Sequence, residues 1–481
     1  MARRGIEYKY IVAIVSVFGL FMELLDATIV NVAIPTLARE FNATTTSIEW
    51  VVTGYLLSLA VFIPVSGWAG DRFGTKRTFM FATGLFTVAS LLCAAAWSIE
   101  SLIVFRAMQG IGGGMLTPVG TAMVFRAFPP EERSKASGLM VIPTTVAPAS
   151  GPVLGGFLID YISWEWIFLV NVPIGVAGFV VAWRFLREHR EPNPGRFDIP
   201  GFVLAATGMG TLLYALAEAG TKGWTSTEVV GFGTAGVVLI AGFVAAELRA
   251  PQPMIDVRLL KDRLFRACNA AQFVGMTGFS ASLFLLPIML QAQRGLSAFE
   301  SGLTSFPMAL GVMTAAQPVS RAYTRLGPRR LIAAGLVVAS LTSFAFYDVD
   351  GGTNLWLVRL LMYVRGMGFG LMLVPLQAAT FSTISPAMTG RASSIFSSGR
   401  MVAQSLGVAV IATVLTSRLS HHGAALGNPA TRAGAFDAFQ EAFVIAGIMT
   451  LVGVIAALAI RDRDAAASMR PRPVGASTPG H

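Results

Sequence analysis

Charged residues are scarce in this sequence. Of its 481 residues only 13% are Asp, Glu, Lys or Arg, whereas 54% are hydrophobic and the mean hydropathy is +0.65. A soluble protein of this length carries about twice that share of charge, roughly 25%. The composition therefore excludes an ordinary soluble enzyme and predicts an all-α polytopic membrane protein.

Cysteine and histidine are also rare. Cys93 and Cys268 are expected near opposite membrane faces, which excludes a disulfide between them. Only four His are present, among them the adjacent His421 and His422, and none has the spacing of a metal or nucleophile site. An enzyme is therefore the least favoured class, and no metal site is predicted.

No phosphate-binding loop of the ATPase type occurs. The glycine cluster at 110–114 superficially resembles a nucleotide loop, but it lies within an apolar run with no preceding strand. The sequence therefore predicts no cofactor and an ion gradient as the energy source.

Long apolar runs fill most of the chain. Fourteen are long enough to cross the roughly 30 Å hydrocarbon core of a bilayer. They cover residues 11–35, 50–70, 78–99, 101–125, 136–159, 166–183, 199–217, 229–246, 267–293, 301–320, 331–347, 354–384, 392–417 and 442–460. The sequence thus predicts fourteen transmembrane helices.

The distribution of basic residues supports an even number of spans. With a cytoplasmic N-terminus, 27 of the 36 Lys and Arg residues fall in cytoplasmic segments, as the positive-inside rule requires. The outside loops hold only Arg39, Lys222, Arg294, Arg418 and Arg432. The net charge of +10 is explained by this topology and by anionic lipid head groups, without nucleic acid. Both termini are predicted to be cytoplasmic.

Three segments recur at nearly constant spacing. The loop at 70–77 matches 323–330, the glycine cluster at 109–114 matches 365–370, and 130–137 matches 386–393, with offsets of 253 to 256 residues. Repeats of this kind are common among secondary transporters. They predict a six-helix half at 1–190, an inserted hairpin of two helices at 191–250 and a second half at 251–462. The tail at 463–481 is rich in Arg, Pro, Gly and Ser, which predicts a disordered cytoplasmic end.

Two acids interrupt the first apolar run. Glu23 and Asp26 are three residues apart, so they share one helical face and could share or pass on a proton. A charge at the bilayer centre costs roughly 2.5 to 3.5 kcal/mol on insertion scales, so such acids normally face a bundle interior or a water-filled path. A permanently ion-paired structural acid is the alternative for Asp26.

Several motifs resemble those of one transporter family. The segment 67–77 (GWAGDRFGTKR) resembles the signature loop of the major facilitator superfamily, and 106–113 (RAMQGIGG) its fourth-span motif. The segment 147–156 (APASGPVLGG) is similar to the fifth-span motif of antiporters. Finally, 25–35 (LDATIVNVAIP) and 164–173 (WEWIFLVNVP) resemble the fourteen-span drug/proton antiporter branch of EmrB/QacA type. The resemblance implies the major facilitator fold, with two six-helix halves plus the hairpin.

This resemblance implies roles for particular residues. Asp26, Glu23 and Arg106 are the proton-coupling candidates, although Glu23 stands where the family more often has an apolar residue and could instead tune substrate charge preference. The gating candidates lie in the signature loop and the fifth span: Asp71, Arg72, Gly74, Lys76, Arg77, Gly151, Pro152, Gly155 and Gly156. Thr324 replaces the acid in the second copy of the loop, so an acid-dependent latch is expected on one side only. Purely structural roles in topology and helix packing remain the alternatives.

Substrate-binding candidates are less sharply marked. Bulky apolar and amide side chains suit amphipathic ligands. The candidates are Asn31, Gln109, Gln272, Phe273, Phe284, Met289, Gln291, Arg365 and Gln377; core or lipid-facing roles are equally open. The spans hold four Arg against two acids, which weakens any inference that substrates are cationic.

The sequence therefore predicts a proton-coupled exporter of small amphipathic compounds in a bacterial cytoplasmic membrane, acting as a monomer by alternating access. A dedicated exporter of an endogenous antibiotic, lipid or peptide-like metabolite is the alternative, and a non-transporting membrane receptor is a third possibility. Sodium in place of protons stays open.

Overall fold

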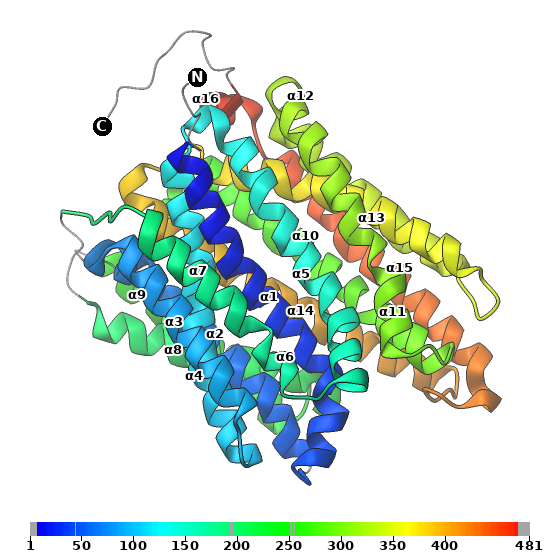
Figure 1. Ribbon diagram of the computed structural model, residues 1–481. Helices are drawn as coiled ribbons and strands as arrows, with labels where there is room; N and C mark the ends of the chain where they lie inside the picture. The colour runs from blue at the N-terminus through cyan, green and yellow to red at the C-terminus, as the bar shows by residue number, and fades with distance from the viewer. Residues whose placement is uncertain (1–6, 44, 193–196, 251–252, 254, 470–481) are drawn as a thin grey trace, which may run out of the picture.

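The computed structural model describes residues 7–43, 45–192, 197–250, 253 and 255–469. Helices make up nearly all of this part of the chain, and no strand occurs in it (Figure 1). The α-helices are α1 (Tyr8–Glu40), α2 (Thr45–Phe73), α3 (Thr75–Ala94), α4 (Ile99–Ala127), α5 (Arg133–Tyr161), α6 (Trp166–Leu169), α7 (Asn171–Phe185), α8 (Ile199–Lys222), α9 (Thr227–Arg249), α10 (Arg263–Ile288), α11 (Ala298–Ser305), α12 (Pro307–Ala345), α13 (Leu355–Thr380), α14 (Thr389–His421), α15 (Arg432–Leu458) and α16 (Ala466–Met469). The all-α prediction is confirmed.

Helices are the expected solution for such apolar segments, because a helix satisfies its own backbone polar groups where no water is available. Short polar side chains mark several starts. The side chains of Ser98, Ser226 and Asn354 each accept a backbone N–H in the first turn of α4, α9 and α13. The helix boundaries therefore follow local sequence signals.

Twelve helical stretches of the described chain are long and apolar enough to cross a membrane. This supports a multi-pass membrane protein, but the count differs from the fourteen expected spans at two places. The expected span 101–125 lies in α4, which is not among the twelve. The expected spans at 301–320 and 331–347 both fall in the single stretch Phe299–Asp348, although Gly327 interrupts it with a non-helical backbone (φ 76°, ψ 163°).

The helix starts repeat with the spacing of the sequence matches. Helix α2 begins at Thr45 and α11 at Ala298, 253 residues later. Helix α4 begins at Ile99 and α13 at Leu355, 256 residues later, and α5 and α14 stand at the same distance. Repeated sequence segments thus occupy equivalent places in the succession of helices.

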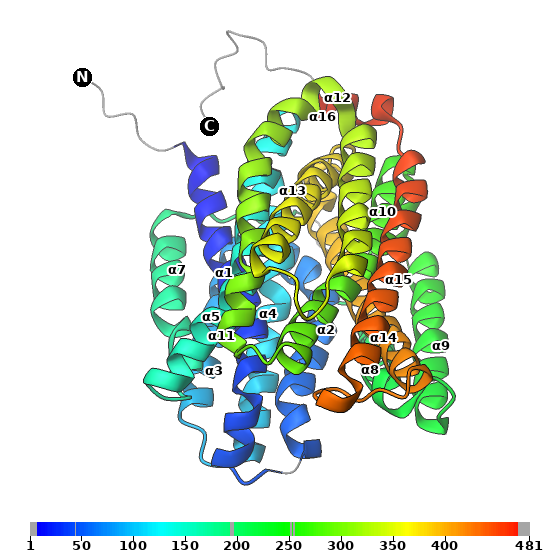
Figure 2. The same ribbon diagram turned by 90° about the vertical axis from the view of Figure 1, so that its right-hand side faces the viewer.

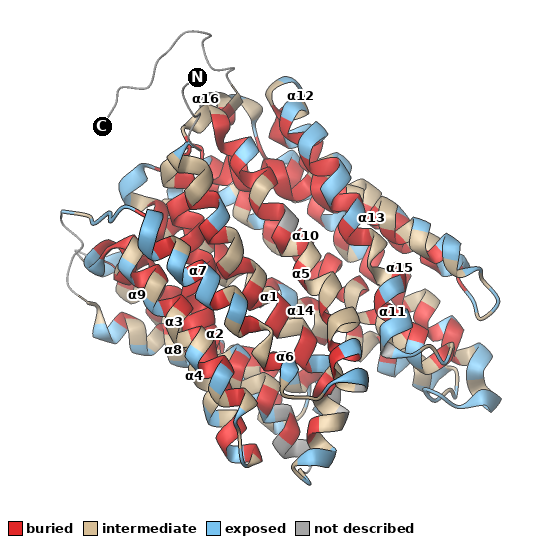
Figure 3. Cartoon of the chain, in the orientation of Figure 1, coloured by how far each residue is buried: buried red, intermediate tan, exposed pale blue. Residues whose placement is uncertain are grey.

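The helices run up and down in one bundle (Figure 2). The start of α1 and the short helix α16 lie at the same end of the bundle, here called the terminal end. Helices α8 and α9 pack on each other, α8 also packs on α2 and α14, and α9 lies at the edge. Buried residues gather along the helix contacts, whereas the outward faces of α7 and α9 are largely exposed (Figure 3).

The predicted disordered tail is folded in its described part. Residues 463–469 lie in a 3-10 turn (Asp462–Ala465) and in α16, while 470–481 lie outside the described residues. The buried Ser468 is hydrogen-bonded to Tyr323 of α12, with 2.7 Å between the two hydroxyl oxygens. This contact anchors the segment to the bundle.

Candidate functional site

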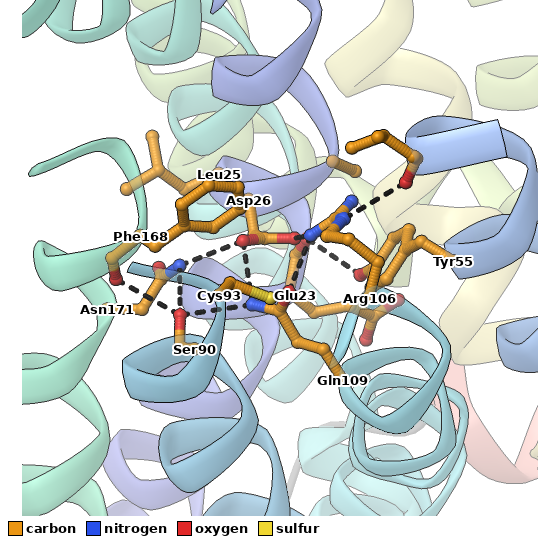
Figure 4. A network of polar contacts seen from close by, with 12 residues as sticks. Glu23, Leu25, Asp26, Tyr55, Ser90, Cys93, Arg106, Gln109, Phe168 and Asn171 are labelled. Atoms are coloured by element: carbon orange, nitrogen blue, oxygen red, sulfur yellow. Dashed lines mark hydrogen bonds and ion pairs between the residues drawn. The ribbon is translucent and has the colours of Figure 1, made fainter. Parts of the chain in front are cut away.

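Asp26 lies at the centre of a buried polar network in the middle of α1 (Figure 4). Its side chain is fully buried and accepts three hydrogen bonds. Arg106 Nη1 is 2.5 Å from Oδ2, and Gln109 Nε2 and Asn171 Nδ2 are 2.8 and 2.9 Å from Oδ1. An ionised carboxylate buried in this way is stable only because a charge and several donors compensate its lost hydration.

Ser90 on α3 closes the network. Its hydroxyl oxygen accepts from Gln109 at 3.1 Å and from Asn171 at 3.2 Å, and its hydrogen is donated to the carbonyl of Phe168 at 3.0 Å. The site thus joins side chains from α1, α3, α4 and α7. A change in the charge of Asp26 would therefore be felt by four helices at once.

Arg106 is fixed on every side. Its Nε donates to the carbonyl of Val51 on α2 at 3.2 Å, and Nη1 also donates to Gln109 Oε1 at 2.6 Å. The guanidinium carbon lies 4.1 Å from the centre of the Tyr55 ring, within the range of a cation–π contact. Fully desolvated charges held this rigidly form a strong pair, and loss of either partner would leave the other exposed to an apolar interior.

Glu23 lies one turn earlier on α1 but has different partners. It is also buried, and it accepts a short hydrogen bond from the hydroxyl of Thr117 on α4. Within the described residues no hydrogen bond joins Glu23 to Asp26. Both acids face α4, as expected for acids that share one helical face, but each has its own polar partners.

Asp71 is buried in the last turn of α2, at the terminal end of the bundle. Its charge partner is not a basic residue of its own loop but Arg126 at the end of α4, 3.6 Å away. Arg126 also pairs with Glu191 at 3.0 Å and donates from Nε and Nη2 to the carbonyl of Pro386, at 3.1 and 2.9 Å. This cluster joins α2 and α4 to the segment that precedes α14.

The other signature-loop residues hold the loop in place. Gly74 has a positive φ of 99°, which favours glycine. Lys76 Nζ donates to the carbonyls of Trp183 and Leu186 at 2.7 and 2.8 Å, and Arg77 lies 3.7 Å from Glu188. Arg72 is exposed. Only Asp71 of this loop therefore reaches the inter-helix cluster.

The glycines of the fifth-span motif lie where helices approach closely. A Cβ on Gly151 would collide with Thr28 of α1, and one on Gly155 would lie 3.0 Å from Ile29. Gly156 faces Phe299, and Pro152 contacts Gly302. The motif packs α5 between α1 and α11, and its small residues allow the helices to approach closely there.

The substrate-binding candidates do not converge on one place. Gln109 belongs to the Asp26 network. Gln272, Met289 and Gln377 are buried, Phe273 and Phe284 are half-buried, and Asn31 and Gln291 are exposed. Gln272 donates to the carbonyl of Phe396, and Asn31 donates to that of Ala27. Met289 belongs to one hydrophobic cluster, against which Phe273 and Phe284 pack, whereas Gln109 lies on α4 and Asn31 on α1.

Arg365 is buried in the interior of α13. Its Nη1 donates to the hydroxyl of Ser343 at 3.0 Å, Nη2 lies 3.5 Å from the carbonyl of Phe279, and the guanidinium faces the Phe279 ring at 5.3 Å. In the described chain no acid forms an ion pair with it. It differs in this respect from Arg106, which pairs with Asp26.

Sequence reasoning missed three members of the network: Ser90, Asn171 and Tyr55. Asn171 carried the clearest signal, since it is an amide within an otherwise apolar run. Ser90 and Tyr55 gave no comparable signal, because such residues are common in membrane helices. Among the described residues, no His, Cys, Asp and Glu cluster suited to a metal exists, and the two cysteines are free and buried.

The bundle and its buried charge network define a polytopic transporter-like membrane protein. The Major Facilitator Superfamily model matches residues 16–408, and the chain belongs to this superfamily. It is 35% identical over 413 residues to "Putative multidrug resistance protein MdtD" of Serratia proteamaculans, covering 86% of each chain. It is 36% identical over 411 residues to "Multidrug resistance protein B homolog" of Mycobacterium tuberculosis, covering 85% of this chain and 76% of that protein. The fold resembles that of the human organic anion transporter MFSD10, with a TM-score of 0.66 at 14% identity over 93% of this chain and 99% of that chain.

Proposed function

We propose that the protein exports amphipathic toxic compounds across the bacterial cytoplasmic membrane in exchange for protons. The observation that carries this proposal is the Asp26–Arg106 pair, a buried and mutually neutralised couple that protonation would break. The names of the bacterial relatives, which are multidrug resistance proteins, support the class of cargo. Membership of a transporter superfamily supports transport over a receptor role.

In this proposal the chain crosses the membrane fourteen times, with both termini in the cytoplasm, and works as a monomer. The break at Gly327 supports two spans within α12, and the 29-residue α4 supplies one more. Residues 1–190 and 251–462 form the two halves, and α8 and α9 form the inserted hairpin. The repeated helix starts support the assignment of the halves.

Protonation of Asp26 would remove the charge that holds Arg106, Gln109 and Asn171 together. Helices α1, α3, α4 and α7 could then shift relative to one another, which favours a second arrangement of the halves. The Asp71–Arg126 cluster would close the cytoplasmic end in one of the two arrangements, with Gly151, Pro152, Gly155 and Gly156 as the sliding contact. Release of the proton to the cytoplasm would restore the Asp26–Arg106 pair.

The test is transport by the purified protein in liposomes with an imposed pH gradient. Asp26→Asn should abolish gradient-driven movement of an amphipathic dye, because asparagine cannot carry the proton. Asp350→Asn, in the exposed turn before α13, is the matched control and should transport normally. Wild-type transport by Asp26→Asn would refute the proposal. A parallel sodium gradient at equal pH separates the two possible coupling ions.

A further inference from the structure

A second pair of intramembrane charges lies outside the Asp26 network. Arg400 on α14 interacts electrostatically with Glu23 on α1, and Glu23 is the acid whose charge acts on it. The two do not form a direct ion pair, since no salt bridge within 4.0 Å joins them in the described chain. The two charges therefore interact without direct contact.

The helix contacts place both residues at a similar depth. Ser393 of α14 donates to the carbonyl of Pro118 on α4 at 2.8 Å, and the neighbouring Thr117 donates to Glu23. Arg400 stands seven residues beyond Ser393, roughly 10 Å along the helix axis. Because α14 and α4 run in opposite directions, Arg400 comes level with the part of α4 around Gly113, whose Cβ would lie 3.6 Å from Glu23 Cγ.

The turn of α14 that carries Arg400 is incompletely packed. A Cβ on Gly399 would meet nothing within 4 Å, although Gly399 is only half-buried. The hydroxyl of Ser398 is buried without a hydrogen-bond partner. Arg400 lies deep in the protein, yet part of its side chain faces space and not other atoms. The three residues are consecutive, so their side chains leave the helix in different directions, and together they show that this turn of α14 is incompletely packed on more than one side.

We propose that Glu23 and Arg400 are the two poles of one substrate site, which binds a zwitterionic amphiphile with its cationic group on Glu23 and its acidic group on Arg400. This deepens, and rests on, the proposed export function. A zwitterion satisfies both desolvated charges at once, whereas a purely cationic ligand meets the repulsion of Arg400 and a purely anionic one that of Glu23. Because α1 and α14 belong to different proposed halves, the ligand would also bridge them.

Three xanthene dyes test this site by direct binding, which needs no proton coupling. Rhodamine B is a zwitterion at neutral pH, its esterified relative rhodamine 6G is a cation, and fluorescein is an anion. Fluorescence polarisation with the protein in lipid nanodiscs, corrected with empty nanodiscs, should show rhodamine B binding about tenfold more tightly than either of the others. Absence of saturable rhodamine B binding would overturn the site.

Substitutions should exchange these preferences. Glu23→Gln should remove the advantage of rhodamine B over fluorescein, and Arg400→Gln its advantage over rhodamine 6G. Arg359→Gln, which removes the guanidinium over Trp356 at the start of α13, is the control and should keep the wild-type order. An unchanged order of the three dyes in both charge variants would refute the two-pole site.

Gly399→Leu keeps both charges and fills the open space, so it should weaken binding of all three dyes. Wild-type affinity in a folded Gly399→Leu protein would show that the space is not the site. Dye movement driven by a pH gradient is recorded in parallel. If the dyes bind in the predicted pattern but do not move, the site is supported and proton-coupled export is refuted. If the dyes move but neither Glu23→Gln nor Arg400→Gln changes their order of affinity, export is supported and the two-pole site is refuted.

Discussion

Two fully buried arginines occupy opposite electrostatic surroundings. Arg106 in α4 pairs with Asp26 at 2.5 Å and is held by amide and carbonyl groups. Arg365 in α13 has a hydroxyl and an aromatic ring beside it, and in the described chain no acid forms an ion pair with it. One cation is neutralised, and the other is merely solvated by the protein.

The frameworks around these arginines are nevertheless equivalent. Ser90 and Ser343 stand 253 residues apart, and so do Asp26 and Phe279. Ser90 holds Gln109, whereas Ser343 holds Arg365, 256 residues after Gln109. The helix packing is therefore repeated but the buried acid is not, so we expect proton coupling on the α1 side only.

The two arginines should differ most in what their removal costs. Arg106→Gln should destabilise the protein by about 3 to 5 kcal/mol, because it leaves Asp26 buried without a counter-charge. Arg365→Gln should change stability by less than about 1 kcal/mol, since no acid is orphaned and Ser343 keeps Ser282 as a partner at 3.2 Å. Thermal unfolding in detergent measures both, and equal losses would contradict the asymmetry.

The same asymmetry predicts a coupling between Asp26 and Arg106. The double variant Asp26→Asn/Arg106→Gln should be more stable than the sum of the two single losses, by roughly 1 to 3 kcal/mol. A double-mutant cycle from thermal unfolding gives this value. Strict additivity would show that the pair contributes little beyond its separate contacts.

Tight helix crossings should respond alike on both sides. A Cβ on Gly110 would collide with the carbonyl of Tyr55, and one on Gly366 with the carbonyl of Met308. Gly110→Ala and Gly366→Ala should each cost about 1 to 3 kcal/mol through overpacking. Gly210→Ala on α8, where a Cβ meets nothing within 4 Å, is the control and should be neutral or mildly stabilising. A loss at only one of the two crossings would show that the packing repeat is incomplete.

The smallest effect concerns the two repeated loops. Glu188 accepts the backbone N–H of Lys76 at 3.0 Å, and Asp462 accepts that of Arg329 at 2.9 Å, each beside a glycine with positive φ. Replacing either acid by alanine should cost about 1 kcal/mol, as for other lost helix caps. Glu188→Gln keeps an acceptor oxygen and should lose less in the same unfolding assay. No change in either alanine variant would mean that water replaces the carboxylate fully.

The fold class and one buried acid could be predicted from the sequence. Apolar run length and the absence of charge predicted an all-helical membrane protein, and the position of Asp26 in such a run predicted a special environment. The charge partner of Asp71 was not predicted, because Arg126 lies far from it in the chain. The count of fourteen spans was not reproduced at α12, where Gly327 interrupts the helix but the two expected spans fall in one apolar stretch.

Hydropathy and helix length are local properties, so the amino-acid sequence is enough to locate the long apolar helices. It also determined which residues carry charge there. Which of these charges are paired depends on helix packing, because the partners of Asp26 come from α4 and α7, which are distant from it in the sequence. The same packing left Arg365 without an acidic partner in the described chain and brought Arg400 near Glu23 without a direct ion pair.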